Sequence, residues 1–120
     1  MRYEVTEADT ATALGSGDVP VLGTPRVIAW MEAATVRAAA PLLDAGQTTV
    51  GVAVRVEHLR ATPVGGTVEV SAEAPGGASG RRLTFAVRAV DAAGAVVAAG
   101  EIDRAIVDRE RFAEAARGER

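Results

Sequence analysis

The stretch from Arg26 to about Leu43 constrains this chain most, because it reads as a helix that is apolar nearly all round. Its apolar residues are Val27, Ile28, Ala29, Trp30, Met31, Ala33, Ala34, Val36, Ala38, Ala39 and Ala40. A helix without a polar face is normally buried, so the rest of the chain must cover it. We expect Thr24 to be the N-cap and Pro25 the first helical residue. Pro41 should tighten the last turn and Gly46 should end it.

The remainder of the chain predicts strands joined by short turns. The four segments are Thr49–Arg60, Thr67–Glu73, Arg82–Val90 and Val96–Val107, and the first two alternate clearly between two faces. Turn-rich connections at residues 63–66, 75–80 and 91–94 separate them. A short strand at Met1–Thr6 and a polar helix at Arg109–Arg120 are expected at the two ends.

One long buried helix followed by four consecutive antiparallel strands predicts an α+β architecture, the hotdog fold. In this fold a curled antiparallel β-sheet wraps around one long central helix. An open sandwich would leave the outer face of the helix in water and would require a polar stripe, which the helix lacks. With 120 residues and no repeat or linker, we expect one domain over residues 1–120.

Composition excludes several classes of function. The chain has no cysteine and one histidine, which excludes a cysteine nucleophile and argues against a metal site, so no metal or cofactor is expected. The net charge is −3, and acidic and basic residues are spread along the chain, so the sequence has no basic cluster of the kind that binds nucleic acid. No signal-peptide pattern opens the sequence, and no apolar run approaches the roughly 20 residues of a membrane span. We therefore expect a cytoplasmic protein without a membrane or nucleic-acid partner.

Three titratable residues fall on faces that otherwise point inward. Glu32 interrupts the apolar helix. His58 falls on the same strand face as four valines, and Arg104 falls on the same strand face as two isoleucines. The valines are Val50, Val52, Val54 and Val56, and the isoleucines are Ile102 and Ile106. Buried charges are normally paired, shifted in pKa or placed in a cavity, so the three residues are candidates to line one pocket. A structural role stays open for His58 and Arg104, whereas nothing at helical spacing can neutralise Glu32.

A glutamate facing a histidine across a helix–sheet interface could carry out acyl transfer. The carboxylate would act as a nucleophile or orient water, the imidazole would relay the proton, and backbone N–H groups would hold the oxyanion. The chain has no Gly-x-Ser-x-Gly nucleophile elbow, and the glycine-rich loop at residues 76–80 reads as a hairpin turn and not as a phosphate cradle.

Several short motifs occur in an order and spacing that resemble a known family. They are Gly-Thr-Pro at 23–25, Met-Glu-Ala at 31–33, Val-Arg-Ala-Ala-Ala-Pro at 36–41, Val-Gly-Val-Ala-Val-Arg-Val-Glu-His at 50–58, Ala-Thr-Pro at 61–63, Gly-Arg-Arg-Leu at 80–83 and Asp-Arg-Ala-Ile-Val at 103–107. From about Val21 to Phe112 the sequence is similar to the hotdog thioesterases typified by fluoroacetyl-CoA thioesterase.

The resemblance implies a site and an activity. It assigns Thr24, Glu32 and His58 as catalytic residues, and Gly51 and Arg104 as substrate-binding residues. Because Thr24 and Glu32 lie eight residues apart and project near the same face of the helix, we expect Thr24 to orient the Glu32 carboxylate. It implies a thioester hydrolase that converts a short or medium acyl thioester, carried by CoA or a carrier protein, to free acid and thiol without a cofactor. The open edges of such a sheet predict a homodimer or a dimer of dimers.

One departure concerns the acyl group. In the fluoroacetyl-specific relative, phenylalanines ahead of the threonine close over the acyl group, whereas the first phenylalanine here is Phe85. We therefore expect no fluoroacetyl preference. Two alternatives stay open. An enoyl thioester hydratase would place an Asp and a His close together in a loop and helix, which His58 on a strand does not match. In an acyl-thioester-binding module, Glu32 would be costly to keep.

Overall fold

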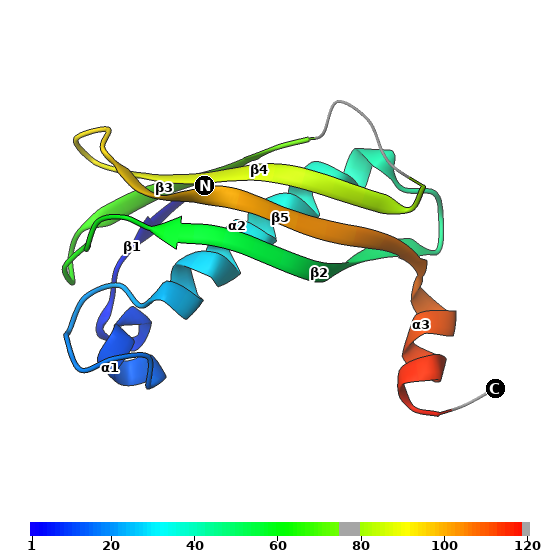
Figure 1. Ribbon diagram of the computed structural model, residues 1–120, viewed down its shortest axis with the longest axis horizontal. Coiled ribbons are helices and arrows are strands. Elements are labelled where there is room, and N and C mark those ends of the chain that lie inside the picture. Colours follow the sequence, from blue (N-terminus) through cyan, green and yellow to red (C-terminus); the bar gives the residue numbers. More distant parts are fainter. Residues whose placement is uncertain (75–79, 119–120) are drawn as a thin grey trace.

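The computed structural model describes residues 1–74 and 80–118, and it has one antiparallel sheet packed against one long helix (Figure 1). The strands are β1 (Arg2–Glu4), β2 (Gln47–His58), β3 (Thr67–Glu73), β4 (Arg82–Asp91) and β5 (Val96–Asp108), in the spatial order β1-β3-β4-β5-β2. The helices are η1 (Glu7–Asp9), α1 (Ala11–Leu14), α2 (Thr24–Ala39), η2 (Ala40–Leu42) and α3 (Arg109–Ala116). The predicted hotdog arrangement is confirmed. The predicted connection at residues 75–80 lies, except for Gly80, outside the described residues.

Helix α2 packs one face against the sheet. Its buried residues recur at helical spacing and are Val27, Met31, Ala34, Thr35 and Ala39. They meet a core supplied mainly by β3, β4 and β5, whose largest buried side chains are Phe85, Ile102, Val68, Val70 and Val97. On the other side of the helix, Val36 is 49% exposed. The prediction of burial all round is therefore wrong for a single chain, because the sheet covers only one side of the helix.

The start of α2 differs from the prediction in one respect. The N-cap is Gly23, whose carbonyl oxygen accepts hydrogen bonds from the N–H groups of Arg26 (3.0 Å) and Val27 (3.2 Å). Thr24 is the first helical residue and Pro25 follows it, so the Thr24 hydroxyl is not used as a cap. At the other end, η2 contains Pro41 and tightens the last turn as predicted. The helix thus ends before Gly46, which has φ 82° in the turn that leads into β2.

Strand β2 contains a β-bulge that changes which residues face the helix. Up to Gly51 the residues pair regularly with β5, and Gly51 lies opposite Arg104; the register then shifts between Gly51 and Ala53. Beyond the shift, His58 lies opposite Ala98, which is fully buried. An inserted residue reverses the alternation, because side chains along a strand point to opposite faces in turn. The prediction that Val50 shares the inner face with His58 is therefore wrong, and Gly51 takes that place.

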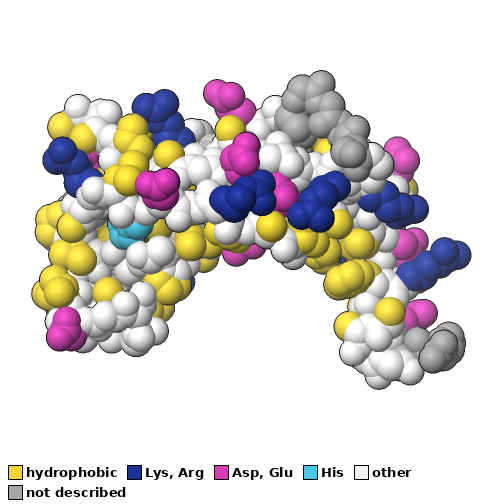
Figure 2. Space-filling model, in the orientation of Figure 1, with side chains coloured by type: hydrophobic (Ala, Val, Ile, Leu, Met, Phe, Trp, Pro, Cys, Tyr) yellow, Lys and Arg dark blue, Asp and Glu magenta, His cyan; other side chains and the backbone are white. Residues whose placement is uncertain are grey.

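β2 is also an edge strand. It has 12 residues and pairs with β5 on one side, and no strand among residues 1–74 and 80–118 pairs with its other side. Val52 and Val54 on this strand are 47% and 43% exposed. Figure 2 shows charged side chains over the sheet and hydrophobic side chains along the lower rim, where β2 runs, above a hollow between α1 and α3.

Candidate active site

Thr24 and His58 form the first part of the candidate site. Thr24 stands at the start of α2 and His58 at the end of β2, and the bulge turns His58 toward the helix. Thr24 Oγ1 and His58 Nδ1 lie 2.8 Å apart, within hydrogen-bond distance. Nε2 of His58 is buried and has no hydrogen-bond partner among the described residues. Burial lowers the pKa of His58 below its ordinary value of 6.5, and a contact with the Arg60 backbone opposes this shift without cancelling it, so the neutral imidazole is favoured.

Glu32, Arg104 and Gly51 form the second part. Arg104 Nη1 on β5 lies 3.6 Å from Glu32 Oε2 on α2, and the side chains are 8% and 41% exposed. Burial lowers the pKa of Arg104, and the Glu32 charge opposes this shift. Gly51 lies opposite Arg104 in the ladder, and a Cβ there would come within 2.9 Å of Glu32 Oε2. The glycine therefore leaves the space that the carboxylate occupies, and the partner of Glu32 comes from a distant strand.

The sequence suggested that Thr24 connects the two parts of the site, but the structure does not show this connection. Thr24 was expected to orient the Glu32 carboxylate, but its hydroxyl contacts His58. Eight residues along an α-helix correspond to a rise of roughly 12 Å, which is beyond the reach of a threonine side chain. Thr24 is therefore placed to orient the imidazole, and Arg104 is placed to orient the carboxylate.

A hollow of about 280 Å³ lies beside the first pair and includes Thr24 and His58 in its lining. The other lining residues are Ala11, Ser16, Val21, Leu22, Leu59, Arg60 and Ala61. Most of these are aliphatic or small, which suits a small acyl group, and Arg60 adds an exposed positive charge at the same place. The segment before the helix thus supplies one wall of this hollow, through Val21 and Leu22.

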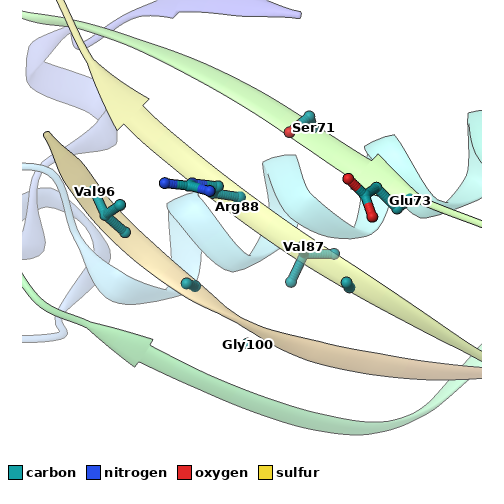
Figure 3. Close-up of a pocket in the computed structure, with 8 residues that line it drawn as sticks. Ser71, Glu73, Val87, Arg88, Val96 and Gly100 are labelled. Atoms are coloured by element: carbon teal, nitrogen blue, oxygen red, sulfur yellow. The ribbon is translucent and has the colours of Figure 1, made fainter. Parts of the chain in front are cut away.

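A second hollow, of about 300 Å³, lies on the opposite face of the sheet (Figure 3). Its polar lining residues Ser71, Glu73 and Arg88 alternate along β3 and β4 with core residues such as Val70 and Ala89. None of the five predicted site residues lines it. Its polar groups come from the solvated side of the sheet, so this hollow is separate from the candidate site on the side that faces α2.

Within residues 1–74 and 80–118, no group of three or more His, Asp or Glu side chains is placed to hold a metal ion. In the same residues, none of the helices has the length and apolar character needed to span a bilayer.

One residue of this site was not identified from the sequence. Thr49 is buried, and its hydroxyl and carbonyl oxygens accept hydrogen bonds from Arg104 Nε (2.8 Å) and Nη2 (3.0 Å). The uninterrupted alternation predicted for β2 placed Thr49 on the face opposite to His58, and only the bulge brings both to the inner face. A threonine in a valine-rich strand carried no other signal.

A curled antiparallel sheet around one helix, with a glutamate on that helix and a threonine–histidine pair at its start, defines a hotdog protein of the thioesterase class. A family model described as fluoroacetyl-CoA-specific thioesterase matches residues 5–110. The chain belongs to this family.

Individual relatives agree with this assignment. The fluoroacetyl-CoA thioesterase of Streptantibioticus cattleyicolor is 40% identical over 92 residues, which cover 77% of this chain and 65% of that protein. A crystal structure of a mutant fluoroacetyl-CoA-specific thioesterase in complex with fluoroacetate and CoA superimposes with a TM-score of 0.88 at 33% identity, covering 98% of this chain and 95% of that one. A thioesterase superfamily member from Thermus thermophilus also superimposes with a TM-score of 0.88, at 25% identity, covering 98% and 85%.

Proposed function

We propose that this protein is an acyl-CoA thioesterase that hydrolyses a short or medium acyl thioester to free acid and thiol. The observation that carries the proposal is the His58 imidazole, whose Nδ1 is held by Thr24 while its buried Nε2 has no partner among the described residues. The hollow beside it has the size and aliphatic lining for a small acyl group. Family membership and the CoA complex of a 33% identical structure support the same substrate class.

In the proposed reaction, Thr24 sets the tautomer of His58. With Nδ1 carrying the proton and donating it to Thr24 Oγ1, Nε2 is left as an acceptor that can take a proton. Arg104 lies beside the Glu32 carboxylate and positions it on the same side of the sheet. Glu32 then attacks the thioester carbonyl or activates the water that does so.

Both routes have the same overall balance, in which water and the thioester give the acid and the thiol. If Glu32 attacks, a C–O bond to its carboxylate forms as the C–S bond breaks, and water then hydrolyses the resulting anhydride. If Glu32 activates water, the C–O bond to water forms directly as the C–S bond breaks. His58 moves a proton from water toward the leaving sulfur, and a thiolate leaves without strong acid assistance. A backbone N–H, for which we propose Gly51, stabilises the oxyanion. Single-turnover hydrolysis in ¹⁸O-labelled water, followed by mass spectrometry of the protein, tests for the first route, because an anhydride that water cleaves at the glutamyl carbonyl leaves the label in Glu32.

The test is a steady-state assay of thiol release from acetyl-, butyryl- and phenylacetyl-CoA. We expect thiol release by the wild type and loss of most of it in Glu32→Gln, with circular dichroism as the control for folding. A hydratase would instead consume the double bond of an enoyl-CoA without releasing thiol, and a binding module would bind acyl-CoA and release none. Either result would replace the proposed function.

We further propose that two chains associate through the open edge of β2, forming a homodimer or a dimer of dimers. The long unpaired edge, the exposed Val52 and Val54 beside it, and the uncovered Val36 of α2 support this arrangement. Light scattering should give at least twice the mass of the chain, and Val54→Lys should shift the equilibrium toward the monomer. A stable wild-type monomer at micromolar concentration would refute the dimer.

An acyl-CoA substrate also leads us to propose a cytoplasmic location, which cell fractionation would test.

A further inference from the structure

The guanidinium of Arg104 is held in place by one residue. Arg104 is 6% exposed, and its Nε donates to Thr49 Oγ1 at 2.8 Å while its Nη2 donates to the Thr49 carbonyl at 3.0 Å. Two donors on neighbouring atoms of the planar group are thus fixed by two acceptors of the same residue. A planar group fixed at two points cannot rotate, so its third nitrogen, Nη1, points in a set direction.

That direction is toward the Glu32 carboxylate. Nη1 lies 3.6 Å from Glu32 Oε2, which is an ion pair at the long end of the range and not a second bidentate contact. The Glu32 side chain is 41% exposed, so water competes for it and the ion pair depends on where the guanidinium is held. Thr49 therefore determines the position of Nη1, and through it that of the carboxylate.

We propose that Thr49 is a positioning residue of the thioesterase site, acting through Arg104 on Glu32. This inference rests on the proposed function for its kinetic consequence, whereas the anchoring of Arg104 can be measured without it. Among the described residues that flank Arg104 in the sheet, Gly51 on β2 and Leu83 on β4 are uncharged. From the helix side, Glu32 is the charged partner. Asp103, next in sequence, lies on the other face and is bound by Arg55 and Arg82.

Three substitutions test the proposal. Thr49→Val keeps the shape of the side chain and the carbonyl contact but removes the hydroxyl acceptor, whereas Thr49→Ser keeps the acceptor. Thr48→Val is the matched control, because it makes the same chemical change one residue earlier, on the opposite face of β2. We expect Thr49→Val to lower kcat about 10-fold, the effect of one lost hydrogen bond to a charged group, with a smaller change in KM. Thr49→Ser and Thr48→Val should stay within about twofold of the wild type.

The two Thr49 substitutions together separate positioning from a general loss of packing. Thr49→Ser keeps the acceptor for Arg104 Nε but loses the methyl group, whereas Thr49→Val keeps the bulk and loses the acceptor. Positioning predicts that kcat falls in Thr49→Val and is retained in Thr49→Ser, with KM changed less than kcat. A purely structural role would give the reverse order, because only the serine leaves unfilled volume. Wild-type kcat in a folded Thr49→Val protein would overturn the proposal.

The anchoring itself is measured by NMR, whether or not the protein proves to be a thioesterase. The Arg104 Nε–H should be protected from solvent exchange in the wild type, with its signal assigned by its loss in Arg104→Lys. Protection should persist in Thr49→Ser and fall at least 10-fold in Thr49→Val. Fast exchange in the wild type, or unchanged protection in Thr49→Val, would refute the anchoring. Absence of thiol release alongside the expected protection would refute the proposed function and leave the anchoring established.

Discussion

Replacing Gly51 with alanine perturbs the Glu32 carboxylate without removing any polar group. The added Cβ would lie 2.9 Å from Glu32 Oε2 and 3.5 Å from Arg104 Nη1. Nonbonded heavy atoms prefer a separation of about 3.5 Å, so the carboxylate must move by roughly half an ångström. Because the Glu32 side chain is flexible and 41% exposed, this movement should leave the core intact.

The expected result is a loss of rate without a loss of stability. A misplacement of about 1 Å at a reacting site can lower the rate about 100-fold, so half of that should lower kcat by roughly 10-fold. The melting temperature should remain within about 2 °C of the wild type, as for substitutions that disturb no buried contact. The assay is kcat for the best acyl-CoA together with thermal unfolding, at one fixed protein concentration.

Gly100→Ala provides the contrast, because the same methyl group would meet backbone instead of a flexible side chain. A Cβ at Gly100 would collide with the carbonyl oxygen of Arg55 and lie 2.8 Å from the Cα of Val56. β2 and β5 would have to separate locally, so the free energy of unfolding should fall by about 1–3 kcal/mol. The melting temperature should then fall by roughly 5–10 °C. Wild-type kcat in Gly51→Ala, or equal destabilisation by the two substitutions, would refute this account of the site.

The remaining predictions concern the reacting groups, their titration and the acyl group. Glu32→Gln and His58→Ala should each abolish most turnover, and the double variant should be scarcely worse than either, since residues that act as a unit lose activity non-additively; additive losses would separate their roles. Burial depresses the pKa of His58 in the folded state, so the unfolded chain binds the proton more readily. The free energy of unfolding should therefore fall as the pH drops below about 6.5 and level off below the folded-state pKa, and urea titrations should show a weaker dependence in His58→Asn. Thr24→Ala should lower kcat less than His58→Ala, because it removes an orienting hydrogen bond, and an equal loss would give Thr24 a reacting role. Comparing acetyl-, fluoroacetyl- and butyryl-CoA should show no fluoroacetyl preference beyond the range of about 10–200-fold that one small apolar group provides, because Val21 and Leu22 line the hollow; a larger preference would refute this.

Local patterns in the sequence predicted most of the architecture. The apolar run after Gly23 predicted α2, and Pro41 marked its tightened end. Alternation predicted the bounds of β3 without error and those of β4 and β5 to within one residue at their ends. These elements follow from the 3.6-residue and 2-residue periods, which depend only on neighbours along the chain.

Candidate site residues could be named from sequence because they violate those same periods. Glu32 stood out in an apolar helix, and Arg104 was expected to share the inner face with Ile102, which the ladder confirms. The violations indicated which residues require an explanation, but they carried no information about partners. Thr24 was therefore paired with Glu32 on the basis of helical proximity, whereas its contact is His58, 34 residues away.

What the tertiary structure alone decided is which groups meet. One inserted residue after Gly51 reverses the faces of β2, and a register shift of this kind depends on the partner strand and not on the alternation within β2. It brings Thr49, Gly51 and His58 to the same side of the sheet, so that Arg104 reaches both Thr49 and Glu32. The uncovered face of α2 has the same origin: the sequence determined that the helix is apolar nearly all round, but the curl of the sheet determined that a single chain covers only one side of it.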